Sequence, residues 1–208
     1  MDTKQKKTFW DFCAPFYDMA ERRNKQAYAG MLKLVRDAVP QGASVLELAA
    51  GTGSVSLAVA GKAAHVLCTD VSAKMLDIAR KKARKQGAAN LTFGHASIFD
   101  TGYSDGVFDV VIAAQVLHLL DAPEKAAAEL RRVAADKLIL PISLTKGLTG
   151  QAKLMVNLFK LLGFSPKKEF DAGDYADFLR EIGFAEFELL MASGKIPMVV
   201  AVWKKAGG

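Results

Sequence analysis

Short apolar runs alternate with amphipathic stretches through the middle of the chain. Strands are predicted at 44–49, 64–69, 91–96, 108–114 and 137–142. The fourth run, FDVVIAA, is almost wholly apolar, which is typical of a parallel strand covered on both faces. Helices with an apolar stripe are predicted between the strands: one at 54–60, one that is capped by Ser72 and runs to Gly87, and one from the capping signal Asp121–Glu124 to about Ala135. This alternation predicts βαβ units, and so an α/β fold with a Rossmann-like, doubly wound sheet.

The two ends of the chain add a second kind of pattern. Aromatic residues stand among charges in the first 20 positions, and an amphipathic helix is predicted at 22–39, so residues 1–40 are expected to form an N-terminal helical cap. A helical stripe at 151–163 lies within a segment, 145–172, that we expect to form a lid over the substrate or to pack on the core.

The C-terminal pattern predicts the last helix and two final strands. Asp174 is expected to cap a helix that ends at Gly183, and strands are predicted at 184–191 and 197–203. The whole chain, 1–208, is therefore expected to form one domain around a seven-stranded sheet. That sheet should be mostly parallel, with an antiparallel C-terminal strand pair.

Composition narrows the class of protein. Of 208 residues, 51% are hydrophobic and 24% are charged, as in globular proteins. The basic N-terminus lacks the apolar region of a signal peptide, and no apolar run is long enough to span a bilayer, so we expect a soluble, cytoplasmic protein. Cys13 and Cys68 fit neither a disulfide framework nor a zinc site, and no metal is expected. Much of the net charge of +6 lies at 74–85, where a solvated helix face is favoured over an anionic partner.

The stretch VLELAAGTGSVSL combines an acid with two glycines at the end of the first strand. Gly51 and Gly53 would let a ligand approach the backbone, but Ser56 stands where a dinucleotide fingerprint has its third glycine. Glu47 would repel a pyrophosphate and attract an ammonium or a sulfonium group. Asp70, at the end of the second strand, can accept hydrogen bonds from ribose hydroxyls. The two acids together favour a ligand with an amino-acid end and a nucleoside end, which describes S-adenosylmethionine.

These motifs resemble those of class I S-adenosylmethionine-dependent methyltransferases, in particular the small-molecule group that includes the ubiquinone/menaquinone biosynthesis C-methyltransferases. The segment from Glu47 to Gly53 matches the family's acid-x-Gly-x-Gly-x-Gly motif, with Ala49 at the first glycine. DVSAKML resembles the family stretch that flanks the adenine, and FGHASIFD carries His95 where the family usually has aspartate. FDVVIAAQVLHLL resembles the fourth strand and its following turn, and FLREIGFAEFELL the stretch before the terminal strands. The resemblance covers residues 40–203.

The resemblance implies a set of site residues. Contacts to S-adenosylmethionine are expected from Tyr17, Glu47, Ala49, Ala50, Gly51, Thr52, Gly53, Asp70, Val71, Met75, His95, Ala96, Ser97, Ile98, Ala113, Ala114 and Gln115. Contacts to the acceptor are expected from Trp10, Phe16, Met155 and Phe159. His118 is the candidate general base, and the alternative is that it packs beneath the following loop.

The implied reaction is in-line displacement of a methyl group from sulfonium onto a small, apolar or aromatic acceptor. Two alternatives stay open: a phospholipid or other membrane-lipid acceptor, and a protein that binds S-adenosylmethionine without turnover. A nucleic-acid amino-methyltransferase is disfavoured because Ala113–Val116 lacks the Asn/Asp-Pro-Pro-aromatic motif, and no nucleic-acid partner is expected. An NAD(P)-dependent oxidoreductase is disfavoured by Ser56 and by the predicted terminal strand pair.

Overall fold

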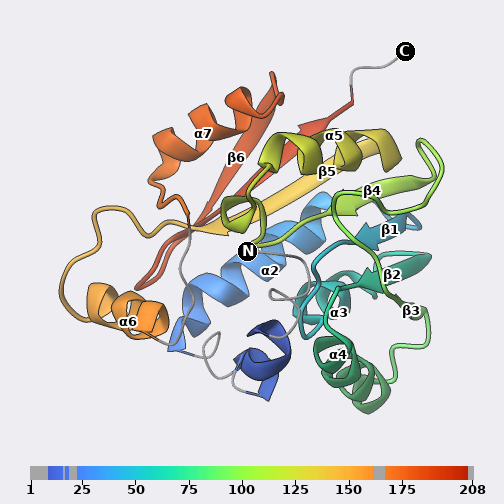
Figure 1. Cartoon of the computed structure of the whole chain (residues 1–208). Coiled ribbons are helices and arrows are strands. Elements are labelled where there is room, and N and C mark those ends of the chain that lie inside the picture. The colour runs from blue at the N-terminus through green and yellow to red at the C-terminus, as the bar shows by residue number, and fades with distance from the viewer. Residues whose placement is uncertain (1–8, 16, 19–22, 162–166, 206–208) are drawn as a thin grey trace.

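One mixed sheet of seven strands organises the molecule (Figure 1). The computed structural model describes residues 9–15, 17–18, 23–161 and 167–205. The strands are β1 (Ser44–Glu47), β2 (His65–Thr69), β3 (Leu91–Gly94), β4 (Phe108–Ile112), β5 (Ala134–Ser143), β6 (Phe187–Ala192) and β7 (Met198–Lys204). Their order is β3-β2-β1-β4-β5-β7-β6. The first five strands pair in parallel, and β7 is antiparallel to both β5 and β6. The predicted fold class is therefore confirmed.

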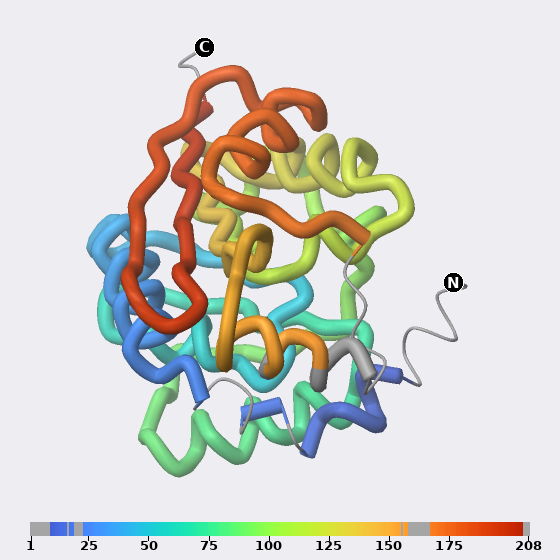
Figure 2. Tube along the Cα trace, turned by 90° about the vertical axis from the view of Figure 1, so that its left-hand side faces the viewer, coloured from blue at the N-terminus to red at the C-terminus, as the bar shows by residue number. Residues whose placement is uncertain are grey.

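Helices cover both faces of this sheet. They are α2 (Lys25–Ala38), α3 (Ser54–Val59), α4 (Ala73–Gln86), α5 (Pro123–Val133), α6 (Gly150–Leu161) and α7 (Ala172–Glu181), with a 3₁₀ turn, η1 (Leu117–Leu119). Successive strand residues point to opposite faces: Val45 packs in the cluster of α2 and α3, whereas Leu46 packs in that of α5 and α7. Figure 2 shows α5 and α7 on one side of the sheet and α2 and α4 on the other. None of the described helices combines the length and apolarity needed to cross a bilayer.

The helix ends confirm one predicted cap and correct two others. Ser72 caps α4, because its hydroxyl accepts a hydrogen bond from the Met75 N–H. Asp174, the predicted cap of α7, is instead the third residue of that helix. The cap is Asp171, which exchanges hydrogen bonds with Asp174 in a capping box.

The predicted capping role of Asp121 and Glu124 is wrong. A capping box formed by Asp121 and Glu124 would require Asp121 to be the N-cap residue. Helix α5 begins one residue later, so the N-cap is Ala122, whose side chain has no hydrogen-bond acceptor. The Asp121 carboxylate instead pairs with the Lys167 ammonium. Glu124 lies in the first turn, where its charge complements the helix dipole.

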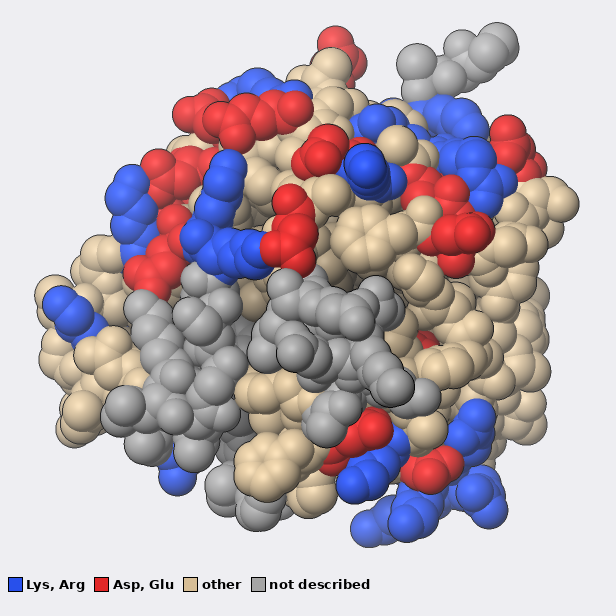
Figure 3. All heavy atoms as spheres, in the orientation of Figure 1, with Lys and Arg blue, Asp and Glu red and all other residues tan. Residues whose placement is uncertain are grey.

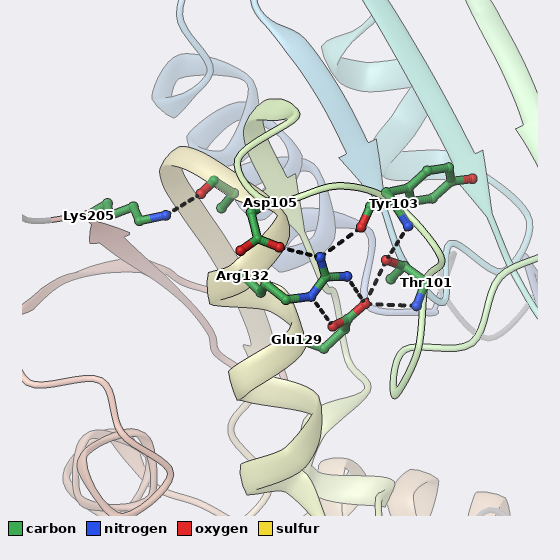
Figure 4. A network of polar contacts seen from close by, with 7 residues as sticks. Thr101, Tyr103, Asp105, Glu129, Arg132 and Lys205 are labelled. Carbon is green, nitrogen blue, oxygen red and sulfur yellow. Dashed lines mark hydrogen bonds and ion pairs between the residues drawn. The ribbon is translucent and has the colours of Figure 1, made fainter.

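A charged cluster clamps the loop after β3 onto α5 (Figure 4). One Glu129 oxygen accepts hydrogen bonds from the N–H and the hydroxyl of Thr101, at 2.8 and 2.7 Å. Arg132 pairs with Glu129 through two nitrogens and also reaches the Tyr103 carbonyl and the Asp105 carboxylate. The Arg132 guanidinium, with help from Thr101, holds the pKa of Glu129 at about 2. The cluster thus fixes the course of the segment that leaves β3.

Charges elsewhere on the surface are distributed unevenly. Figure 3 shows acidic and basic side chains interspersed at the top of that view, where α5 and α7 lie, and lysines and arginines gathered near α4. On α4, Lys81, Arg84 and Lys85 are exposed and the last two occupy the final turn, as the solvated-face interpretation predicts. Lys82 departs from it, because its ammonium turns inward to Asp18 and Ser54.

We expect Glu129→Gln to destabilise the fold in a pH-dependent way. The folded-state pKa lies below the ordinary value of 4.5, so the contribution is present above pH 4.5 and is lost as the pH falls through about 2. Urea unfolding at neutral pH should show a loss of about 1–2 kcal/mol, and the gap to wild type should close as the medium is acidified. The matched control is Asp177→Asn, because Asp177 forms an exposed ion pair with Arg180 on α7. A gap that stays constant with pH would contradict the clamp.

Candidate active site

The carboxyl ends of four adjacent strands bring the predicted cofactor residues together. In the order β3-β2-β1-β4, these strands end at Gly94, Thr69, Glu47 and Ile112. The segments that follow are those predicted to bind the cofactor: His95–Ile98 after β3, Asp70–Met75 after β2, the glycine turn after β1, and Ala113–Gln115 after β4. Parallel strands end at the same edge, which is where ligands bind in open α/β sheets.

The turn after β1 is held in a conformation that favours glycine. Ala49, Gly51 and Gly53 have φ angles of 54°, 55° and 75°. At Gly53 a Cβ would lie 2.8 Å from the Cβ of Ala79, so a side chain is excluded both by packing and by backbone angle. At Gly51 the nearest atom to an added Cβ is Cε1 of Tyr17, at 3.8 Å. Ala49 occupies the first glycine position of the motif and carries a strain of about 1–2 kcal/mol.

Asp70 joins this turn to the start of α4. Its Oδ2 accepts a hydrogen bond from the Gly51 N–H and its Oδ1 accepts one from the Ser72 N–H, both at 2.8 Å. The residue is 6% exposed, and burial raises the pKa of the carboxyl even though backbone N–H groups oppose that shift. Each oxygen keeps a further lone pair, which a ribose hydroxyl can use.

Glu47 lies beneath the turn and is 1% exposed. Its Oε2 accepts a short hydrogen bond from the Ser56 hydroxyl, and its backbone carbonyl accepts one from the Thr69 hydroxyl. Cys68 lies nearby: burial and then the Glu47 charge raise its thiol pKa to about 12. Cys68 is therefore a protonated, unreactive thiol at neutral pH.

The residues predicted to contact the adenine include three buried apolar side chains and the exposed His95. Met75, Ala96 and Ile98 are buried, and the two segments that carry them are joined by a contact of 2.5 Å between His95 Nδ1 and the Asp70 carbonyl. Because a carbonyl only accepts, Nδ1 carries the proton in this contact. In the neutral ring Nε2 is then a hydrogen-bond acceptor, as the carboxylate oxygens of an aspartate are.

The N-terminal segment is bonded to both cofactor loops. Asp18 accepts hydrogen bonds from the Thr52 hydroxyl, at 2.5 Å, and from the Lys82 ammonium, at 3.2 Å. Lys82 also reaches the hydroxyls of Thr52 and Ser54. Asp11 accepts a hydrogen bond from the Ser72 hydroxyl. Tyr17 thereby lies beside the glycine turn, and its ring meets that of Trp10 edge to face.

Sequence reasoning misses Asp11, Asp18 and Lys82. The two aspartates precede any periodic pattern, and Lys82 stands in a basic run that the charge pattern assigns to a solvated helix face. Their bonding depends on segments more than 25 residues apart in the chain. One sequence signal could have located Lys82: it lies one helical turn after Ala79, on the buried side of α4. This spacing indicates that its side chain points toward the glycine turn.

His118 is buried in η1, just beyond the end of β4. Burial lowers the pKa of its imidazole to about 4, so the side chain is neutral at pH 7. An effective general base has a pKa near the working pH, and this one lies well below neutrality. The environment therefore favours packing beneath the loop, and the role of base stays a prediction.

Gln115, the last predicted cofactor residue, has a φ of 55° and bonds to the end of β5. Its Nε2 donates to the Ser143 hydroxyl at 2.8 Å, and its Oε1 accepts from the Ser143 N–H at 3.0 Å. Sequence reasoning misses Ser143 as a site residue, because only the parallel pairing of β4 with β5 brings it beside the turn after β4.

The structure locates the predicted acceptor contacts only in part. Trp10 is half-buried beside Tyr17. Phe16 lies outside the described residues, as do the side chains of Met155 and Phe159 on α6. Helix α6 follows the carboxyl end of β5 and lies on that side of the sheet (Figure 1). The assignments of 1–40 as a cap and of 145–172 as a lid stay predictions.

Comparison with known proteins supports the same interpretation. A family model described as a methyltransferase domain matches residues 45–137. A demethylmenaquinone methyltransferase of Clavibacter sepedonicus is 39% identical over 92 residues, which cover 44% of this chain and 37% of that protein. A ubiquinone/menaquinone biosynthesis C-methyltransferase of Brucella anthropi is 25% identical over 212 residues, which cover 85% of this chain and 79% of that protein.

A solved structure shows the same fold. Magnesium protoporphyrin IX methyltransferase from Synechocystis PCC 6803, determined with bound S-adenosylhomocysteine, is 20% identical and has a TM-score of 0.69. The match covers 99% of this chain and 100% of that one. Together with the strand order and the acid-flanked glycine turn, these findings show a methyltransferase domain with the class I methyltransferase fold, similar to the quinone-biosynthesis C-methyltransferases.

Proposed function

We propose that this protein transfers a methyl group from S-adenosylmethionine to a small acceptor that is apolar or aromatic. The observation that carries the proposal is the pair of buried carboxylates, Glu47 and Asp70, on either side of the glycine turn. Anionic groups at both positions suit a ligand with a cationic end and a ribose, and they oppose a pyrophosphate. The similarity to quinone-biosynthesis methyltransferases favours an oxygen-bearing aromatic acceptor.

The residues fit the cofactor in three parts. Asp70 would hold the ribose hydroxyls through its spare lone pairs, and the open approach at Gly51 would admit the methionine end above Glu47. Buried Met75, Ala96 and Ile98 would enclose the adenine. When bound, the cofactor supplies an electrophilic methyl group on a sulfonium sulfur.

The protein's own contribution is mainly to position the reactants and to exclude water. In-line transfer needs the acceptor lone pair to be aligned with the methyl group, and such alignment can supply up to about 7–11 kcal/mol. The bonds from Asp11 and Asp18 hold Tyr17 and Trp10 beside the glycine turn, where they would restrict solvent. A strong base is needed only when the acceptor arrives protonated.

Asp70→Asn tests the cofactor site. We expect calorimetric titration to show micromolar binding of S-adenosylmethionine and S-adenosylhomocysteine and no comparable binding of NAD(H). Asn keeps the size of the side chain but cannot accept from two N–H groups and a ribose, so both affinities should fall by about 1.5–3 kcal/mol. Asp177→Asn, on exposed α7, is the matched control and should bind as wild type does.

Each other result of that titration has a distinct meaning. NAD(H) binding alone would contradict the interpretation of the glycine turn. Tight S-adenosylmethionine binding without turnover on any acceptor in a hydrophobic extract would favour the non-catalytic alternative. A thermal melt of each variant separates loss of the site from loss of the fold, because Asp70 also ties the turn to α4.

A membrane-lipid acceptor is the second candidate, favoured by two exposed apolar side chains, one in the N-terminal segment and one on α6. Phe12 is 70% exposed and Leu154, on α6, is 71% exposed. If the acceptor is a lipid, the protein should float with phosphatidylglycerol-containing vesicles, and Leu154→Gln should weaken flotation. The control Met191→Gln changes an equally apolar but distant residue on β6 and should not weaken it. A wild-type protein that stays unbound would exclude this candidate.

A further inference from the structure

Two polar side chains meet at the carboxyl ends of β4 and β5 and form a closed pair. The Gln115 amide donates from Nε2 to the Ser143 hydroxyl and accepts at Oε1 from the Ser143 N–H, at 2.8 and 3.0 Å. The backbone of Gln115 is also fixed, because its N–H donates to the Pro141 carbonyl at 2.9 Å. Gln115 is therefore held at three points on the neighbouring strand.

The orientation of the amide follows from the chemistry of its partners. A backbone N–H can only donate, so the atom facing the Ser143 nitrogen is the amide oxygen. The amide nitrogen then faces the Ser143 hydroxyl and donates to it, so the hydroxyl oxygen accepts in this bond. The hydroxyl hydrogen must point elsewhere, and among the described residues the Ser143 hydroxyl has no further partner.

The backbone conformation of Gln115 indicates that surrounding contacts hold the residue in this arrangement. Its φ of 55° lies in the left-handed region, where residues other than glycine are uncommon. Such outliers persist where surrounding contacts over-determine them, and they gather at functional sites. Here the contacts that hold Gln115 are its hydrogen bonds to Pro141 and Ser143, and the same bonds orient its amide toward Ser143.

The strand order places this pair where the acceptor should lie. Glu47 and Asp70, at the ends of β1 and β2, mark the cofactor side. Strand β4 pairs with β1 on the side away from β2, and β5 lies one strand further. Gln115 and Ser143 are both half-buried, so they border the site without being sealed in the core. With the cofactor bound as proposed, the pair would lie next to its methionine half and away from its adenine.

We infer that the Ser143 hydroxyl donates a hydrogen bond to a carbonyl or phenolic oxygen of the methyl acceptor, and that Gln115 is the positioning residue that turns the hydroxyl proton toward it. This inference rests on the proposed function and names its acceptor class, an oxygen-bearing ring. A site that hydrogen-bonds a substrate oxygen discriminates against the analogue that lacks it.

Two ligands that differ by one carbonyl test the inference: 1-tetralone and tetralin. Each is titrated into the protein saturated with S-adenosylhomocysteine. We expect wild type to bind 1-tetralone about three- to tenfold more tightly than tetralin, as one hydrogen bond predicts. Ser143→Ala should remove this preference, and Ser143→Thr, which keeps the hydroxyl, should retain it.

Gln115→Glu is the sharper variant because the new side chain has nearly the same shape. Its carboxylate still accepts from the Ser143 N–H, but an acceptor oxygen replaces the donor Nε2. The Ser143 hydroxyl would then donate to the introduced carboxylate, and the preference for 1-tetralone should be lost with the serine still present. A role in packing alone would leave the preference in place.

The outcomes separate this inference from the proposed function. Failure of wild type to bind S-adenosylhomocysteine would overturn the proposed function itself. Binding of S-adenosylhomocysteine would leave that function standing, while three results would overturn the inference alone: no binding of 1-tetralone, equal affinity for the two ligands, or a preference that survives in Ser143→Ala or Gln115→Glu. Thermal melts of the variants confirm that each ratio is measured on folded protein.

Discussion

The Asp70 carboxylate is the interaction on which the rest of the site depends. Its two oxygens accept from Gly51 and Ser72, so one side chain fixes both the glycine turn after β1 and the start of α4. Burying a carboxylate is costly, and the raised pKa of Asp70 records that cost. The two backbone N–H groups offset part of it, and a ribose would offset more. A buried carboxylate that still has free hydrogen-bond acceptor sites, and is stabilised when a ligand fills them, is suited to ligand recognition.

The surroundings extend this constraint outward. Lys82 and Asp18 connect the glycine turn to the N-terminal segment, and the Glu129–Arg132 pair fixes the loop that leaves β3. Each contact joins a loop at the sheet edge to a helix or to the N-terminal segment. The loops that would surround the cofactor are therefore held by polar contacts, while the apolar clusters stabilise the sheet beneath them.

The sequence is informative about the fold because periodicity and turn residues act locally. The apolar run of β4, the Ser72 cap and the acid-flanked turn can all be predicted from adjacent residues. The predicted cap at Asp121 is wrong because one residue of helix register cannot be inferred from composition. The bond between Gln115 and Ser143 spans 28 residues and exists only because β4 pairs with β5. Contacts of this kind follow from the tertiary structure and leave no local pattern.

Hydrogen exchange with and without S-adenosylhomocysteine tests the central claim most directly, because it locates binding along the whole chain. The account predicts slower exchange of backbone amides in three segments: 49–53 after β1, 70–75 after β2 and 95–98 after β3. Exchange of the backbone amides of α7, which packs against β5 and β7 away from the predicted cofactor loops, should change little. Protection confined to other segments, or binding without protection of the glycine turn, would contradict the assignment of this edge as the cofactor site.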